Sequence, residues 1–151
     1  MRKQGAISAA WDVTVPFHDV DLAGVVWHGH YMKYLENARW AVMDRIGFTL
    51  EEMITSGFLW PIVSVQVKYV RAARYGDHLR VQASLVEWQT RLAVNYLIVD
   101  VKDNARVGRA QTVQVAVDAK THALQWVSPP CLTERVELAL KNNNPHSERA
   151  Q

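Results

Sequence analysis

Four segments with the pattern of β-strands follow one another in the second half of this chain, and short connections separate them. They span Ile62–Arg71, His78–Trp88, Leu92–Val101 and Arg106–Val117. The connections at Gln89–Arg91 and Lys102–Ala105 are turn-sized. A crossover between parallel strands needs a dozen or more residues, so these strands are predicted to be antiparallel neighbours in one sheet.

A single long amphipathic helix is predicted before these strands. From Tyr31 to Ile46 apolar residues recur at helical spacing, and Gly47 supplies a C-terminal stop. In Ile62–Arg71 apolar and polar residues instead alternate strictly, which predicts a half-buried strand. Its apolar face carries Val63, Val65, Val67 and Tyr69. The expected fold is α+β, with one antiparallel sheet of about five strands wrapped around one long central helix.

The chain of 151 residues is expected to form one domain over residues 1–140, followed by a polar tail at 141–151. Two weaker extended segments complete the pattern, a short one at Trp11–Val15 and a strand extension at His122–Val127. The order of elements is therefore β-α-β-β-β-β.

Charge and cysteine content exclude several classes of protein. Seventeen basic against fifteen acidic residues give a net charge of +2, too even to predict nucleic-acid or membrane binding. Cys131 is the only cysteine, which excludes an internal disulfide and a multi-cysteine zinc site. Apolar runs are far shorter than the ~18 residues that span a bilayer. Gln4, Gly5 and Ser8 interrupt the apolar core that a signal peptide needs, so a cytoplasmic protein is expected.

Reactive side chains concentrate in the loop that precedes the helix. Between His18 and Tyr31 the chain carries three histidines and two carboxylates. The first backbone N–H groups of a helix have no intrahelical partner, so they can hold an anion or a developing oxyanion. A carboxylate a few residues upstream is then placed to act as base or nucleophile.

This loop resembles the signature of hot-dog-fold thioesterases of the 4-hydroxybenzoyl-CoA thioesterase and YbgC-like acyl-CoA thioesterase family. The similar stretches are Asp19-Val-Asp21-Leu-Ala-Gly24-Val-Val26-Trp-His28-Gly-His-Tyr31, then Tyr34-Leu-Glu36-Asn-Ala-Arg39, and Tyr69-Val-Arg71-Ala-Ala73-Arg-Tyr75-Gly76-Asp77-His-Leu79. The resemblance covers roughly residues 10 to 130. It implies hydrolysis of an acyl-CoA, aliphatic or aromatic, to a free acid and coenzyme A, with no cofactor and no metal.

The resemblance also implies roles for individual residues. Asp21 falls on the carboxylate that attacks the thioester or activates water, and His28 falls where a backbone N–H polarises the thioester carbonyl. Gly24 matches the glycine that turns the loop close to the substrate. The residues expected to line the substrate are Gly24, Val26, Trp27, His30 and Tyr31. A homodimer or homotetramer is implied, with sites between protomers.

The sequence departs from the family pattern at two positions, and the acidic residues of the motifs have alternative roles. His30 stands where related sequences often have Asn, and Ala72 where many have Pro. Asp21 and its neighbour Asp19 are also common turn-forming residues. Glu36 is a rival catalytic carboxylate, or an i,i+3 partner of an arginine on an exposed helical face.

Arg91, at a turn between strands, is the preferred ligand of the coenzyme A phosphates, ahead of Arg71 and Arg74. Two other functions stay open. One is a non-catalytic protein that binds acyl-CoA or acyl-carrier protein. The other is a metal-dependent hydrolase built on His18, His28 and His30, although their spacing makes the side chains diverge.

Overall fold

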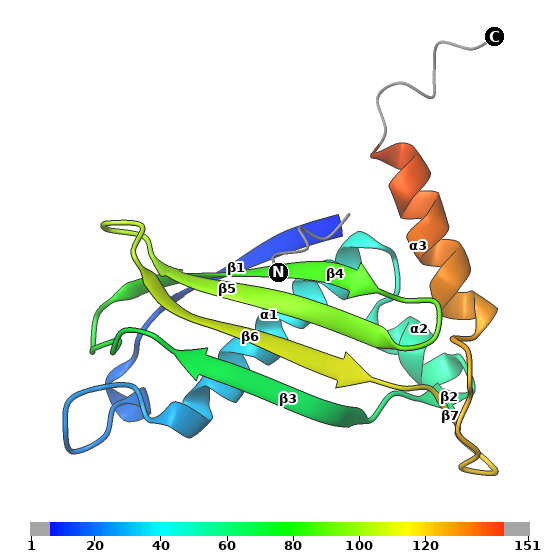
Figure 1. Cartoon of the computed structure of the whole chain (residues 1–151), viewed down its shortest axis with the longest axis horizontal. Coiled ribbons are helices and arrows are strands. Elements are labelled where there is room, and N and C mark those ends of the chain that lie inside the picture. The colour runs from blue at the N-terminus through cyan, green and yellow to red at the C-terminus, as the bar shows by residue number, and fades with distance from the viewer. Residues whose placement is uncertain (1–6, 144–151) are drawn as a thin grey trace, which may run out of the picture.

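The computed structural model describes residues 7–143, and a five-stranded antiparallel sheet dominates it (Figure 1). The strands are β1 (Ile7–Thr14), β3 (Ile62–Tyr69), β4 (His78–Glu87), β5 (Leu92–Asp100) and β6 (Arg106–Gln114). Their spatial order is β1-β4-β5-β6-β3, and each neighbouring pair is antiparallel. Two short strands, β2 (Phe58–Leu59) and β7 (Val117–Asp118), pair beside this sheet.

One long helix, α1 (Tyr31–Arg45), packs against one face of the sheet, mainly on β1 and β4. Its buried residues include Leu35, Ala38 and Val42, and the facing residues of β4 are Leu79, Val81, Ala83 and Leu85. Each fully buried Leu or Val side chain contributes roughly 1.5–3 kcal/mol to the free energy of burial. The predicted long helix and five-stranded antiparallel sheet are confirmed.

The outer β segments differ from the prediction. The first strand is not the short Trp11–Val15 segment but starts at Ile7, which pairs with Leu85 of β4. Cross-strand partners hold Ile7–Ala10 in the sheet, and such partners leave no periodic signal in the sequence. The predicted strand at His122–Val127 is wrong, because only Leu124 makes an isolated bridge, to Val117.

Two helices were not predicted. The shorter, α2 (Leu50–Thr55), has an N-cap at Thr49, whose side chain accepts the backbone N–H of Glu52. The longer, α3 (Pro130–Asn142), begins with proline at its first position and ends beyond the predicted domain limit at residue 140. Residues 144–151 of the predicted tail lie outside the described residues. None of the helices within 7–143 is long and apolar enough to cross a membrane.

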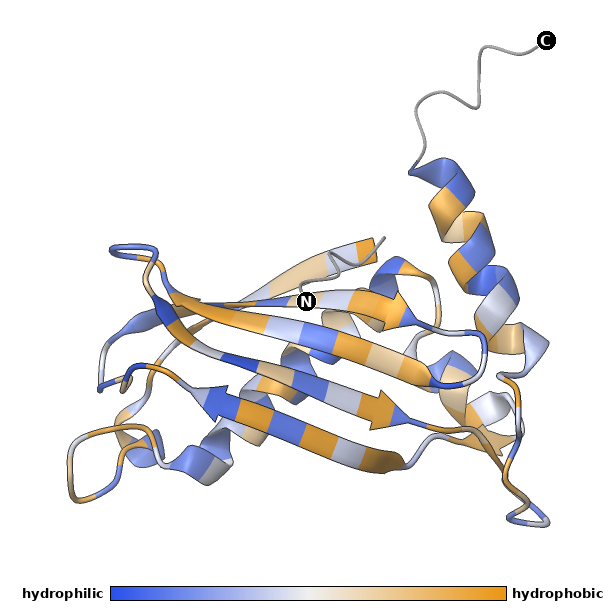
Figure 2. Cartoon of the chain, viewed as in Figure 1, coloured by the Kyte–Doolittle hydropathy of each residue, from blue (hydrophilic) through white to orange (hydrophobic). Residues whose placement is uncertain are grey.

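The edge strand β3 is more exposed than the alternating pattern predicts. Val63 is 58% exposed and Tyr69 is 48% exposed, although both belong to the apolar face. The reason is the position of α1, which packs mainly on β1 and β4, the two strands at the opposite edge of the sheet from β3. Figure 2 shows hydrophobic and hydrophilic residues alternating along β3. The strand is confirmed over Ile62–Tyr69, with an irregular register at Val63. The predicted half-buried state is wrong for this strand within one chain.

Candidate active site

The loop before α1 folds as a small hairpin. The Trp27 N–H donates to the carbonyl of Asp19 at 3.0 Å, and the Asp21 N–H donates to the carbonyl of Val25 at 2.9 Å. At the tip, Gly24 donates its N–H to the Asp21 carbonyl and has a φ of 77°. Glycine adopts this left-handed conformation without steric cost. The hairpin thus turns at the glycine that the motif places there.

Asp21 lies exposed at the tip of this hairpin. Its Oδ1 accepts the N–H of Ala23 at 2.8 Å, which is the local bond expected of a turn-forming aspartate. Within residues 7–143, Oδ2 has no hydrogen-bond partner. The two roles considered for Asp21 are therefore compatible, because one oxygen orients the carboxylate while the other stays free to react.

Asp19, in contrast, is 2% exposed and anchors the hairpin to α1. Its carboxylate accepts Lys33 Nζ and the Tyr34 hydroxyl, each at 2.6 Å. Burial raises the pKa of the Asp19 carboxyl, but the hydrogen bonds from Lys33 and Tyr34 outweigh burial and hold that pKa below its usual value. His30 Nδ1 lies 3.9 Å from the same carboxylate. These contacts tie Asp19 to α1, whereas one carboxylate oxygen of Asp21 has no hydrogen-bond partner within residues 7–143.

A short 3-10 turn, η2 (His28–His30), leads into α1 and provides free donors. In the part of the chain that the structure describes, the backbone N–H groups of His28 and Gly29 have no acceptor. The neighbouring groups are occupied, since the Trp27 carbonyl accepts the His30 N–H and the His28 carbonyl accepts the Tyr69 hydroxyl, both at 2.9 Å. Two free N–H groups ahead of a helix form an electropositive position that suits a thioester oxygen.

Gly29 packs directly beneath the ring of Trp27. A Cβ added to Gly29 would lie 2.3 Å from this ring, so a larger residue here would require the indole to move. The Trp27 ring stays partly exposed beside His28 and His30. Val26 and Tyr31 are buried, so they support the loop from the core instead of facing solvent.

The rival site residues have other surroundings. Glu36 is 61% exposed and lies 3.9 Å from Arg39. The predicted i,i+3 pair of Glu36 with Arg39 is confirmed. Only the exposed setting is wrong for Arg39, which is buried because its face of α1 turns toward the sheet. Among residues 7–143, no three metal-ligating side chains gather at one point, so His18, His28 and His30 are not brought together.

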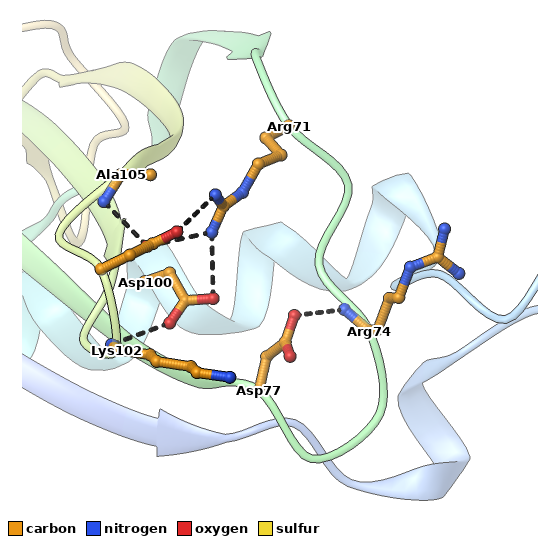
Figure 3. Close-up of polar contacts among 7 residues, drawn as sticks. Arg71, Arg74, Asp77, Asp100, Lys102 and Ala105 are labelled. Atoms are coloured by element: carbon orange, nitrogen blue, oxygen red, sulfur yellow. Dashed lines mark hydrogen bonds and ion pairs between the residues drawn. The ribbon is translucent and has the colours of Figure 1, made fainter.

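Two of the three candidate arginines already have carboxylate partners. Arg71 donates to Asp100 at 3.1 Å and to Asp103 at 2.9 Å (Figure 3). These contacts raise the pKa of Arg71, with the hydrogen bond to Asp103 as the largest cause. Arg91 pairs with Glu87 at 2.9 Å in the turn between β4 and β5. That turn lies at the opposite end of the sheet from the hairpin before α1 (Figure 1).

Arg74 is placed differently from both. Its backbone N–H donates to Asp77 at 2.8 Å, and its side chain extends away from that carboxylate (Figure 3). The guanidinium reaches the tip of the hairpin, since a Cβ added to Gly24 would lie 3.9 Å from Arg74 Nη1. Within one chain, Arg74 is therefore the arginine beside the candidate site.

Comparison with known proteins identifies a family for this chain. The family model of the thioesterase-like superfamily matches residues 15–140. A putative esterase of Synechocystis is 30% identical over 125 residues, which cover 82% of this chain and 75% of that protein. The acyl-CoA thioester hydrolase YbgC of Escherichia coli is 28% identical over 109 residues, which cover 72% of this chain and 81% of that protein.

A solved structure shows the same fold. The 1,4-dihydroxy-2-naphthoyl-CoA thioesterase from Synechocystis superposes with a TM-score of 0.77 at 21% identity, covering 90% of this chain and 97% of that chain. The hot-dog fold and the family resemblance predicted from the loop motifs are confirmed.

Proposed function

The chain belongs to the thioesterase-like superfamily, and we propose that it hydrolyses acyl-CoA thioesters to a free acid and coenzyme A. The observation that carries this proposal is the pair of backbone N–H groups at His28 and Gly29, which have no acceptor within residues 7–143. They lie between the hairpin and α1, in the same loop as Asp21, of which one carboxylate oxygen has no hydrogen-bond partner in this part of the chain. Similarity to enzymes named acyl-CoA thioester hydrolase supports the reaction class.

The proposed mechanism needs only these groups. The thioester carbonyl oxygen accepts the His28 N–H, which stabilises the negative charge that forms on it. Asp21 either removes a proton from an attacking water or attacks the carbonyl carbon itself, giving an anhydride that water then cleaves. In both routes the C–S bond breaks and coenzyme A leaves as a thiolate. A thiolate is a good leaving group, so no strong general acid is required.

A panel of acyl-CoA esters tests this function. Aliphatic esters of increasing chain length, aromatic esters and one acyl-carrier-protein thioester would be compared by release of free thiol. We expect turnover of at least one class, and the panel also reveals the acyl preference. Binding without thiol release for every ester would instead identify a non-catalytic acyl-CoA or acyl-carrier-protein binding protein.

We also propose that the protein works as a homodimer or homotetramer with sites between protomers. The support is β3, an edge strand with unpaired backbone groups and an exposed apolar face that includes Val63 and Val65. Exposed apolar edge strands favour pairing with another chain.

Val65→Lys should weaken self-association by about tenfold or more, because the lysine charge would be buried in the proposed interface. Gln66→Lys is the matched control, since Gln66 is exposed on the opposite face of the same strand. Sedimentation velocity of both variants measures the effect, with thiol release as a second readout. A wild-type protein that is monomeric and fully active at assay concentration would contradict the proposal.

We propose that Arg91 binds the phosphates of a coenzyme A ester whose thioester lies in the active site of a neighbouring copy of this chain. The Arg91 turn and the hairpin of its own chain lie at opposite ends of the sheet (Figure 1). The nine residues of β5, at about 3.3 Å each, extend roughly 30 Å along it. Arg91→Ala should raise KM several-fold and change kcat little, because nucleotide binding is nearly uniform between ground and transition states. The difference should shrink as salt rises, since the Debye length is about 8 Å at physiological ionic strength.

A short pantetheine thioester without the nucleotide is the control substrate, and both proteins should hydrolyse it equally. Arg74→Ala is the matched comparison, because Arg74 lies beside Gly24 of the same chain. An unchanged KM for Arg91→Ala at low salt, with a raised KM for Arg74→Ala, would transfer the phosphate-binding role to Arg74.

A further inference from the structure

We propose that Tyr69 is a positioning residue for catalysis, whose hydroxyl holds the peptide between His28 and Gly29 so that the free Gly29 N–H faces the thioester oxygen beside the His28 N–H. The inference rests on the proposed function, because it concerns the second of the two free donors on which that function depends. It assigns a role in the reaction to the edge strand β3, which carries no reacting group.

The peptide between Trp27 and His28 is fixed on its N-terminal side by backbone contacts. The Trp27 N–H donates to the Asp19 carbonyl at 3.0 Å, and the Trp27 carbonyl accepts the His30 N–H at 2.9 Å. Asp19 is itself tied to α1 through Lys33 and Tyr34. Because the Trp27 carbonyl and the His28 N–H lie in one planar peptide, the direction of the His28 N–H follows the position of the hairpin and the helix.

On its C-terminal side, His28 is held from the sheet. The Tyr69 hydroxyl donates to the His28 carbonyl at 2.9 Å, across 41 positions of sequence. The Tyr69 ring packs edge-on against Tyr31 at 5.1 Å and against His28 at 6.5 Å between centroids. The His28 carbonyl and the Gly29 N–H belong to one planar peptide, so the direction of the Gly29 N–H is set by a hydroxyl on β3.

The hydroxyl is suited to this bond. Burial raises the pKa of Tyr69 above its usual value, so near neutral pH the phenol keeps the proton that it donates. The backbone of Tyr69 is paired with Gly108 of β6, which places the ring at the end of a rigid strand. Donors that stabilise an oxyanion act mainly through such preorganisation, so a small loss of orientation reduces the rate more than it reduces binding.

Tyr69→Phe tests the inference, because it removes one oxygen and keeps the ring packing. With the best ester of the panel, kcat should fall by about three- to tenfold, the size expected for one lost hydrogen bond, while KM and melting temperature stay close to wild type. Tyr75→Phe is the matched control. Tyr75 is 64% exposed, and its hydroxyl makes no hydrogen bond within residues 7–143, so its kinetics should not change.

A double-variant cycle shows which donor Tyr69 positions. In a His28→Pro background the Gly29 N–H is the remaining donor, so adding Tyr69→Phe should lower kcat by about the same factor as in the wild type. No further loss in that background, or an unchanged kcat for Tyr69→Phe alone in an active enzyme, would overturn the inference. If the wild-type protein releases no thiol from any ester, the proposed function itself fails, which is a different result.

Discussion

His28→Pro is expected to lower kcat by about 10²- to 10³-fold, the usual loss when one oxyanion donor is removed. Proline lacks the backbone N–H, so the variant deletes the proposed donor directly. The site tolerates the ring, because His28 is the first residue of η2, a position where proline is favoured. Trp27 before it has φ −59° and ψ 133°, the extended conformation that a residue preceding proline prefers.

The cost to the fold should be small, since this N–H makes no hydrogen bond within residues 7–143. The melting temperature of His28→Pro should therefore stay near that of the wild type. His28→Ala is the control, because it removes the imidazole and keeps the N–H, and its kcat should stay within a few-fold of wild type. If His28→Ala loses as much activity as His28→Pro, the imidazole is the working group and the proposed oxyanion site is wrong.

The elements closest to the site could be predicted because their signals are local. The helical spacing from Tyr31 to Ile46 agrees with α1 to within one residue at its C-terminal end. The motif around Asp21 and Gly24 likewise contains the residues that build the hairpin, whose hydrogen bonds join positions only a few residues apart. Periodicity and motif spacing report such short-range geometry well.

Burial could not be predicted in the same way, because it depends on how distant elements meet. The alternation of Val63 and Val65 is visible in the sequence, but their exposure follows from α1 packing on β1 and β4. The sequence does not reveal that β3 pairs with β6 at the edge of the sheet opposite β1, because strand order depends on contacts between residues far apart in the sequence.

The same limit applies to the site's supporting residues. Tyr69 belongs to a quoted motif, but its bond to His28 spans 41 positions and is not encoded in local spacing. Gly29 packs against the ring of Trp27, a contact that a single sequence does not show. By contrast, α3 had a usable signal, because Leu132 and Val136 are spaced one helical turn apart behind Pro130.

Asp21→Asn should lower kcat by about 10²- to 10⁴-fold, the range for losing a positioned base. The amide keeps the shape of the carboxylate and keeps an oxygen that can accept the Ala23 N–H, so the hairpin should survive. What is lost is the negative charge on the free oxygen, and with it the ability to take a proton or attack a carbonyl. Thiol release under substrate saturation measures the effect.

Two further variants decide between carboxylates. Asp19→Asn removes a buried charge paired with Lys33 at 2.6 Å, so it should mainly lower the melting temperature. Glu36→Gln alters a carboxylate that is 61% exposed and should leave kcat nearly unchanged. If Asp21→Asn keeps more than about a tenth of wild-type turnover while Glu36→Gln loses it, the reacting carboxylate is Glu36, and the hairpin serves only to shape the entrance to α1.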